Sequence, residues 1–251
     1  MHDHHVHIGQ FNEIYYDYHD VFFALKENGI SEITLAYLTP KFDDEEYAVG
    51  FYKAVVEELK QAKQYANKIG LIINILHWAE PLLFSARISL NKIFENFEYK
   101  GIALHPVLHD WSKSHADKLT EIFKFADFHN LPIYIHTGCS ECDQPLQFEK
   151  WFKDFPTVEV HLAHCKDSAP IIELFSKYKN LYGDTAFCPK DSFDAICKAG
   201  FKDRMLFGTD FPVTHWYEHC GEKKISADLN SLTESYARTL KSFAQYFPKY
   251  V

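Results

Sequence analysis

The sequence lacks the features that mark several large classes of protein. Glycine occurs only 10 times in 251 residues, and no collagen-like or low-complexity repeat is present. No run approaches about 18 apolar residues, so we expect no transmembrane helix and no membrane partner. The first residues are too polar for a signal peptide and no Asn-x-Ser/Thr sequon occurs, which favours a cytoplasmic location.

Basic charge and cysteine are also scarce. The formal net charge is −9 without a basic block, so a nucleic-acid partner is disfavoured. The 6 cysteines are too few and too scattered for a disulfide scaffold in a chain of this size, which indicates reduced thiols. Hydrophobic residues at 47% and charged residues at 24% are typical of an ordinary globular protein.

The residues that are present alternate between two patterns. Short runs of Val, Ile, Leu and Tyr predict buried strands, and apolar residues at every third or fourth position between them predict amphipathic helices. The helix signals include a capping pattern from Asp43 and a stop at Asn130. The predicted strands are 4–8, 32–38, 71–77, 101–106, 132–137, 158–164, 180–185 and 205–209.

Eight strand–helix units in about 250 residues predict an α/β fold, a (β/α)8 TIM barrel formed by a single domain over residues 1–251. A doubly wound open sheet is the alternative. It is disfavoured because neither a G-x-G-x-x-G motif after the first strand nor a P-loop is present.

Histidines in the first predicted strand suggest a metal site. Alternate residues of a strand point to the same side, so His5 and His7 should face one cation together. A cloning tag is the plain alternative, although Val6, Ile8 and Gly9 break that pattern. His4 and His161 are out of phase with the predicted site residues, and we expect them to be structural.

Three further strands end in a His or an Asp. These residues are His136, His164 and Asp210, each at the point where an apolar run stops. Active sites of barrels collect at the carboxyl ends of the strands. One terminal histidine would more often be structural, but three such residues together with the His5–His7 pair point to one site.

This set of residues resembles the amidohydrolase superfamily, and within it the compact amidohydrolase-2 group of barrel hydrolases and decarboxylases. The resemblance covers essentially the whole chain, but its specific motifs are short. They are Asp3-x-His5-x-His7, the Ile-His-Thr-Gly around His136, the Leu-Ala-His ending at His164, Gly208-Thr209-Asp210-x-Pro212 and the segment 101–106. The resemblance implies that His5, His7, His136 and Asp210 bind the metal, while His164 binds a second metal or contacts the substrate.

The chain departs from the two-metal members of that group in one respect. These members commonly carry a carboxylated lysine or a glutamate on the third or fourth strand, whereas this chain has Ala103, and Glu80 is the only nearby carboxylate. We therefore expect one divalent metal, with a second as the alternative. Zinc is the first choice for a histidine-rich site with one carboxylate, although manganese, iron and nickel stay open.

The expected activity is hydrolysis of a small organic substrate at an amide, lactone or related C–O or C–N bond by a metal-activated water. Asp210 would accept the proton of that water, and His164 would help to stabilise the oxyanion. A decarboxylase of an unsaturated or aromatic acid is the main alternative. A TatD-like deoxyribonuclease is less favoured, and a metal-binding protein without activity is a further alternative.

Residues near the strand ends are candidates for binding a small-molecule substrate. They are His105, Arg87, Lys166 and Trp78, for which loop packing or solvated surface charge is the plain alternative. Cys139 and Cys142 form a C-x-x-C sequence, and Cys165 and Cys188 follow the next two strands, so we expect Cys139, Cys165 and Cys188 to line one edge. These thiols are loop residues, a second metal site or an oxidation-sensitive cluster. A homo-oligomer is possible, but the sequence does not decide the oligomeric state.

Overall fold

A computed structural model describes residues 1–85, 87–222, 225–243 and 246. The chain forms two compact units, which are described separately. Unit 1 comprises Met1–Thr39, Glu57–Ile75 and Phe207–Val251, and unit 2 comprises Pro40–Val56 and Leu76–Leu206. The helix α2 (Glu45–Ile69) and the strand β4 (Ile72–Ala79) each continue from one unit into the other.

Unit 1 is organised around β1 (His2–Phe11), in which Val6 and Ile8 are fully buried. It pairs in parallel with β3 (Glu32–Leu38) and forms a hairpin with β2 (Ile14–Tyr16). A register shift lies between Asp3 and Val6. Segment 207–211 runs beside β1, because His4 N donates to Phe207 O and His7 N donates to Phe211 O. The first strand is therefore held on both sides.

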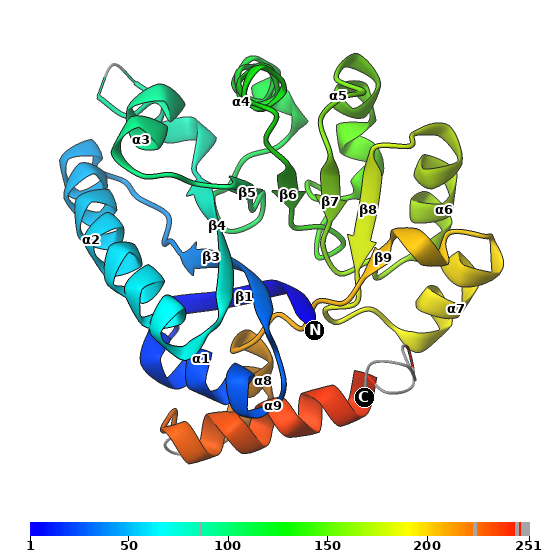
Figure 1. Cartoon of the computed structure of the whole chain (residues 1–251). Coiled ribbons are helices and arrows are strands. Elements are labelled where there is room, and N and C mark those ends of the chain that lie inside the picture. Colours follow the sequence, from blue (N-terminus) through cyan, green and yellow to red (C-terminus); the bar gives the residue numbers. More distant parts are fainter. Residues whose placement is uncertain (86, 223–224, 244–245, 247–251) are drawn as a thin grey trace. The chain divides into compact units, whose positions relative to one another are not determined.

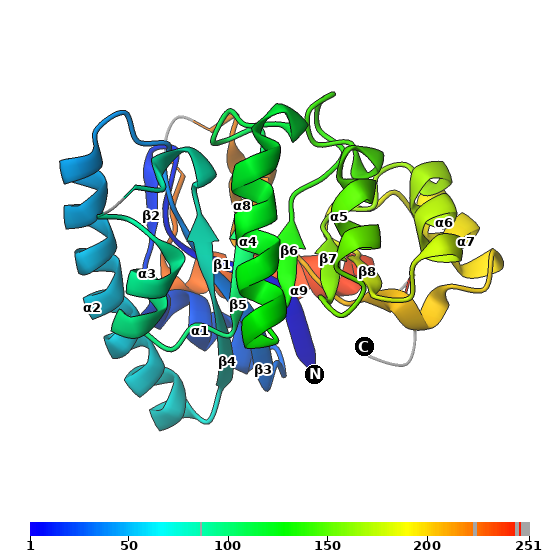
Figure 2. The ribbon, with the colours of Figure 1, turned by 90° about the horizontal axis from the view of Figure 1, so that it is seen from above.

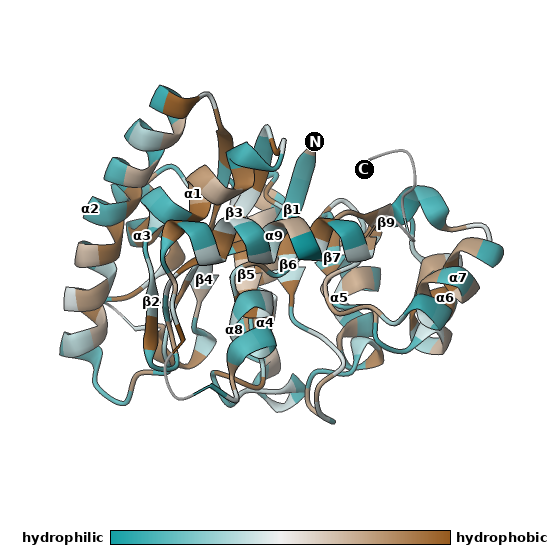
Figure 3. Ribbon diagram, turned by 90° about the horizontal axis from the view of Figure 1, so that it is seen from below, coloured by the Kyte–Doolittle hydropathy of each residue, from teal (hydrophilic) through white to brown (hydrophobic). Residues whose placement is uncertain are grey.

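Helices of unit 1 bury one apolar face each. α1 (Tyr18–Glu27) begins at Asp17, whose side chain accepts a hydrogen bond from His19 N. It packs against α9 (Leu229–Phe243), as Figure 1 shows. Leu232, Tyr236 and Leu240 recur at four-residue spacing and are buried, and Figure 3 shows hydrophobic and hydrophilic residues alternating along α9. α8 (Val213–His219) lies between segment 207–211 and α9 in the chain.

Unit 2 contains a parallel sheet whose strands pair in chain order. They are the end of β4, β5 (Gly101–Leu104), β6 (Ile133–Ile135), β7 (Val160–Leu162), β8 (Leu181–Asp184) and β9 (Met205–Leu206). Leu104 pairs with Ile135, Ile135 with Leu162, and Leu162 with Gly183. The residues that follow these positions therefore emerge at the same edge of the sheet.

Amphipathic helices connect the strands of unit 2. α4 (Ala116–His129) ends at Asn130, which adopts the left-handed conformation with φ 53°. Figure 2 shows α4 and the shorter α5 (Glu149–Asp154) beside the strands β6 and β7. α3 (Leu90–Asn96), α6 (Ser168–Lys177) and α7 (Lys190–Lys198) complete the alternation. Single 3-10 turns lie at 81–83, 113–115, 145–148 and 202–204.

All eight predicted strands are present, but most of those in unit 2 are shorter than predicted. The hairpin strand β2 was not predicted, because three residues are too few to show an alternating pattern. The expected helix start at Asp43 is one residue too early, since the Asp44 side chain accepts from Tyr47 N at 2.7 Å. Within the described residues, no helix is both long and apolar enough to cross a membrane.

Candidate metal centre and strand-end histidines

The predicted residues of unit 1 meet at the side chain of Asp210. His7 Nε2 lies 3.1 Å from Asp210 Oδ1, and His5 Nε2 lies 3.7 Å from the same oxygen. The backbone also joins them, because Asp210 N donates to His5 O at 2.8 Å. Asp210 has φ 58°, a left-handed conformation that costs a non-glycine residue about 1 kcal/mol or more. The carboxylate is thus held against the histidines at the expense of local strain.

A hydrogen bond to the opposite ring nitrogen fixes the protonation of neutral His7. His7 Nδ1 lies 2.9 Å from Ala36 O, and a carbonyl oxygen only accepts, so Nδ1 carries the hydrogen. The unprotonated Nε2 then faces the Asp210 carboxylate. The electron pairs of His7 Nε2 and Asp210 Oδ1 at 3.1 Å repel each other unless a proton or a metal ion lies between them. A metal-binding histidine typically donates its other N–H to a carbonyl in this way, so the donor set fits a divalent metal.

The Asp3 carboxylate supports His5 on one side and Thr209, the residue before Asp210, on the other, and it has no exposed surface. Its carboxylate accepts from His5 N at 3.1 Å, from Thr209 N at 3.1 Å and from Thr209 Oγ1 at 2.6 Å. Tyr236 of α9 donates its hydroxyl at 2.8 Å. Burial raises the pKa of Asp3 to about 6, and the hydrogen bonds from Thr209, Tyr236 and His5 oppose that rise. Asp3 belongs to the Asp3-x-His5-x-His7 motif seen in the sequence, but nothing in the sequence pointed to Tyr236.

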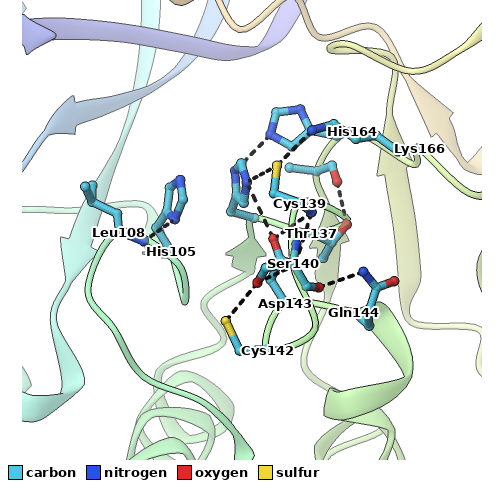
Figure 4. A network of polar contacts seen from close by, with 12 residues as sticks. His105, Leu108, Thr137, Cys139, Ser140, Cys142, Asp143, Gln144, His164 and Lys166 are labelled. Atoms are coloured by element: carbon cyan, nitrogen blue, oxygen red, sulfur yellow. Dashed lines mark hydrogen bonds and ion pairs between the residues drawn. The ribbon is translucent and has the colours of Figure 1, made fainter. Parts of the chain in front are cut away.

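In unit 2, three planar side chains are stacked at the carboxyl edge of the sheet. His105 follows β5 and stacks on His136, which follows β6, with ring centroids 3.8 Å apart. Trp78 stacks on His105 at 5.8 Å with an interplanar angle of 9°. Leu108 N donates to His105 Nδ1 at 3.0 Å, so the proton of neutral His105 is on Nε2 (Figure 4).

A chain of hydrogen bonds fixes the tautomers of His164 and His136 in their neutral forms. His164 Nδ1 lies 3.0 Å from Ala186 O and must donate, so its Nε2 accepts from His136 Nδ1 at 2.9 Å. His136 Nε2 is then unprotonated and lies 3.1 Å from Cys139 Sγ. Asp184 supports the arrangement by accepting from His164 N at 2.9 Å. The predicted contact of His164 with an oxyanion would require its bond to His136 to open.

The loop after β6 is folded around a carboxylate that the sequence reading missed. Asp143 has no exposed surface and accepts from Cys139 N at 3.0 and 3.1 Å and from Ser140 N at 2.7 Å. Lys166 Nζ lies 2.8 Å from Cys139 Sγ (Figure 4). The C-x-x-C sequence drew attention to the thiols, while Asp143 one residue later carried no separate signal.

Several other predicted residues have clear partners. Arg87 is exposed and pairs with Glu46 at 3.4 Å, so its role in substrate binding stays a prediction. Glu80 is buried and accepts from Phe42 N at 3.3 and 3.5 Å. His161 pairs in register with Tyr134, packs on its ring and contacts Glu159 at 2.6 Å. Tyr134 lies two residues before His136, so His161 lies on the same face of the sheet as Tyr134 and is not out of phase with His136, contrary to expectation.

Two of the cysteines expected at the edge are buried. Cys165 lies against Gly183, where an added Cβ would come within 2.3 Å of its sulfur. Burial raises the pKa of the Cys188 thiol to about 12 and that of Cys165 well above its ordinary value. The expectation that all three thiols line one edge is therefore wrong for Cys165 and Cys188, which are buried, and Cys139 is the exposed member.

Comparison with protein-family models shows which family the chain belongs to. The family model described as Amidohydrolase (Amidohydro_2) matches residues 50–225. The chain belongs to this amidohydrolase family. The match includes His136, His164 and Asp210 and excludes His5 and His7. It confirms the resemblance and supports an enzyme. No curated protein sequence matches the amidohydrolase chain at a significant level.

Solved structures with low sequence identity show the same fold. A probable 2-pyrone-4,6-dicarboxylic acid hydrolase from Acinetobacter baumannii, with citric acid bound, has a TM-score of 0.61 at 10% identity, over 97% of this chain and 93% of that one. A 5-carboxyvanillate decarboxylase from Novosphingobium aromaticivorans, complexed with manganese, has a TM-score of 0.56 at 13% identity, over 90% and 79%. A TatD-like protein from Archaeoglobus fulgidus has a TM-score of 0.60 at 13% identity, over 100% and 94%.

These likenesses confirm the predicted fold class, the α/β barrel of the amidohydrolases. The relatives span both hydrolysis and decarboxylation, so the family fixes the general kind of enzyme rather than its reaction. The single-domain organisation and the assignment of individual site residues stay predictions.

Proposed function

We propose that this amidohydrolase is a metal-dependent hydrolase of a small organic substrate, acting on an amide, a lactone or a related C–O or C–N bond. The observation that carries the proposal is the approach of the unprotonated His7 Nε2 to Asp210 Oδ1 at 3.1 Å. A nitrogen and a carboxylate oxygen oriented in this way suit a divalent cation, most simply one Zn²⁺.

The proposed chemistry assigns a task to each residue of the group. A bound divalent metal lowers the pKa of water and polarises a carbonyl group. Ala36 O holds His7 with its Nε2 toward Asp210 Oδ1, and His5 presents its Nε2 to the same oxygen, so these side chains would hold the metal. We assign to Asp210 the acceptance of the proton from the attacking water. Asp3 keeps His5 and the residue before Asp210 in place.

The other site residues predicted from the sequence extend this proposal. His136 and His164 are proposed to complete the metal site or, in the case of His164, to contact the reacting carbonyl. His105 and Trp78 are proposed to bind the substrate, together with Lys166 and Arg87. Trp78 is buried and orients the ring of His105 by stacking on it, and we assign to the N–H at His105 Nε2 a polar contact with the substrate.

The test combines metal analysis with a panel of substrates. Purified protein is assayed for bound metal, stripped with a chelator, reloaded, and offered lactones, amides and carboxylic acids. We expect turnover that disappears on stripping and returns on reloading. Asp210→Asn should lose both metal and turnover, whereas Asp117→Asn, on the exposed surface of α4, should lose neither. Release of CO₂ without consumption of water would establish the decarboxylase instead. Bound metal without turnover on any substrate would leave a non-catalytic protein.

A further inference from the structure

Ring side chains form a continuous row along the carboxyl edge of the sheet in unit 2. Its members lie at or just after the ends of the successive strands β4 to β8, and neighbouring ring centroids are 5.8, 3.8, 4.5 and 6.0 Å apart. In order, they are Trp78, His105, His136, His164 and Phe187. Trp78 and His164 are buried, whereas Phe187, which ends the row, is 38% exposed. Phe187 therefore places an exposed apolar ring beside the strand-end histidines.

The backbone at Phe187 is strained. Cys188 N donates to Thr185 O at 3.1 Å, which closes a turn with Ala186 and Phe187 at its two central positions. Phe187 has φ 51°, and a positive φ at the third position of a turn normally takes glycine or asparagine, because other side chains crowd the backbone there. A bulky ring thus occupies a position whose geometry favours a smaller residue.

Hydrogen bonds from the loop after β7 hold this turn in place. Ala186 N donates to Asp184 Oδ1 at 3.1 Å, and the same oxygen accepts from His164 N at 2.9 Å. Ala186 O accepts from His164 Nδ1 at 3.0 Å. The bonds that fix His164 therefore also fix the residue before Phe187. Strained residues that their surroundings hold in this way are concentrated at functional sites.

The exposure of the ring favours a role in binding over a role in packing. Ala186 and Cys188, on either side of Phe187, are buried, so the turn is packed without the phenyl ring being covered. A single exposed apolar residue is common on protein surfaces, but it gives no reason to keep a strained backbone that glycine would relieve. The exposed ring suits a planar unsaturated or aromatic group, because aromatic pairs are favoured beyond the area that they bury.

We propose that Phe187 is a specificity-determining residue, whose ring contacts the group attached to the reacting carbonyl and selects substrates in which this group is aromatic or otherwise planar and unsaturated. The inference rests on the proposed function, in which His164 contacts that carbonyl. Since the ring of Phe187 is centred 6.0 Å from the ring of His164, a group next to the carbonyl would lie within reach of the phenyl ring. A phenyl ring transfers no proton and binds no divalent metal, so Phe187 acts on affinity rather than on the chemical step.

Benzoate and cyclohexanecarboxylate form a matched pair of probes. Both are carboxylates with the same number of carbon atoms, both are ionised at pH 8, and only benzoate has a planar ring. Isothermal titration calorimetry of the full-length protein loaded with Zn²⁺ gives a dissociation constant for each. We expect the native protein to bind benzoate about 3-fold or more tightly than cyclohexanecarboxylate, the order that a favourable aromatic pair adds. Phe187→Leu keeps apolar bulk without a ring and should bind the two equally, while Phe187→Tyr should keep the preference.

Phe128→Leu is the matched control, because Phe128 is an exposed phenylalanine of α4 in the same unit. It should keep the native preference for benzoate. The proposal would be overturned if the native protein bound neither probe or showed no preference. It would equally be overturned if Phe187→Leu kept the preference, even with both probes bound more weakly, as a purely structural role predicts.

The calorimetric preference does not depend on turnover, so failure of this inference is distinguishable from failure of the proposed function. A preference that depends on Phe187, in a protein that hydrolyses no lactone or amide, would support the contact and contradict the hydrolase. Hydrolysis by a protein without that preference would support the hydrolase and contradict the contact.

Discussion

The buried carboxyl of Glu80 predicts a loss of stability as the pH rises. Glu80 is 2% exposed, and its carboxyl group accepts two long hydrogen bonds from Phe42 N. Burial raises its pKa from 4.5 to about 7, and the Phe42 hydrogen bond and Lys41 only partly oppose this rise. The folded protein therefore holds the Glu80 proton at pH values where the unfolded chain has released it.

The sign and size of the effect follow from the two pKa values. Below 4.5 both states are protonated and the group has no effect; above about 7 the folded state contains a buried carboxylate and is destabilised. The difference between these two pKa values corresponds to about 3 kcal/mol of unfolding free energy, at 1.36 kcal/mol for each pKa unit, and to less where solvent reaches the carboxylate. Glu80→Gln removes the ionisation and can still accept from Phe42 N. We expect it to stabilise the protein by about 1–3 kcal/mol at pH 8 and by less than 1 kcal/mol at pH 5.

Urea denaturation at pH 5 and pH 8 measures this difference. Glu121→Gln, at an exposed position of α4, is the matched control and should follow the native protein at both pH values. The reasoning would be refuted if Glu80→Gln and the native protein lost the same free energy of unfolding between pH 5 and pH 8.

Three further predictions concern other parts of the two units. Asp210→Asn should reduce turnover by at least 100-fold, the order expected when a charged catalytic group is lost, with an unchanged circular dichroism spectrum; full activity would remove Asp210 from the mechanism. Tyr236→Phe removes one hydrogen-bond donor from the buried Asp3 and should lower the free energy of unfolding by about 1–3 kcal/mol, as measured by urea denaturation. An unchanged free energy of unfolding would mean that the Tyr236 hydroxyl does not stabilise Asp3. Burial lowers the pKa of His77 to about 3, so stability that is present above pH 6.5 should fall as the pH drops toward 3. His77→Phe, in a pocket of aromatic rings, should flatten that fall, and an unchanged acid limb of the stability profile would contradict it.

The sequence predicted the strands well because buried parallel strands are short, nearly continuous apolar runs. Glu32–Leu38 was predicted with its observed bounds, and the residues after β5, β6 and β7 emerge at one edge as the alternation requires. The strand ends were less predictable. β6 ends at Ile135 and β7 at Leu162, before His136 and His164, although His136 N still donates to Leu104 O of the neighbouring strand.

The supporting contacts of the site could not be read from the sequence. Asp143 is four residues from Cys139, but its role depends on a loop that folds around a buried carboxylate. Tyr236 reaches Asp3 only because α9 packs in unit 1, and its helical spacing is that of any core residue. Pattern analysis therefore finds residues whose chemistry is unusual for their position and misses partners whose type is ordinary.

The hydrogen bond from Tyr236 to Asp3 also bears on the order in which the molecule is made. The two residues are 233 positions apart. At roughly 5–20 residues per second, the ribosome adds the tyrosine roughly 10–50 s after the aspartate. During that interval the nascent chain exposes His5 and His7 without the carboxylate of Asp210 or the hydroxyl that steadies Asp3. Completion of the proposed metal-binding group is therefore a late event in biosynthesis, and we expect a metal to bind this group only after Asp210 has been added.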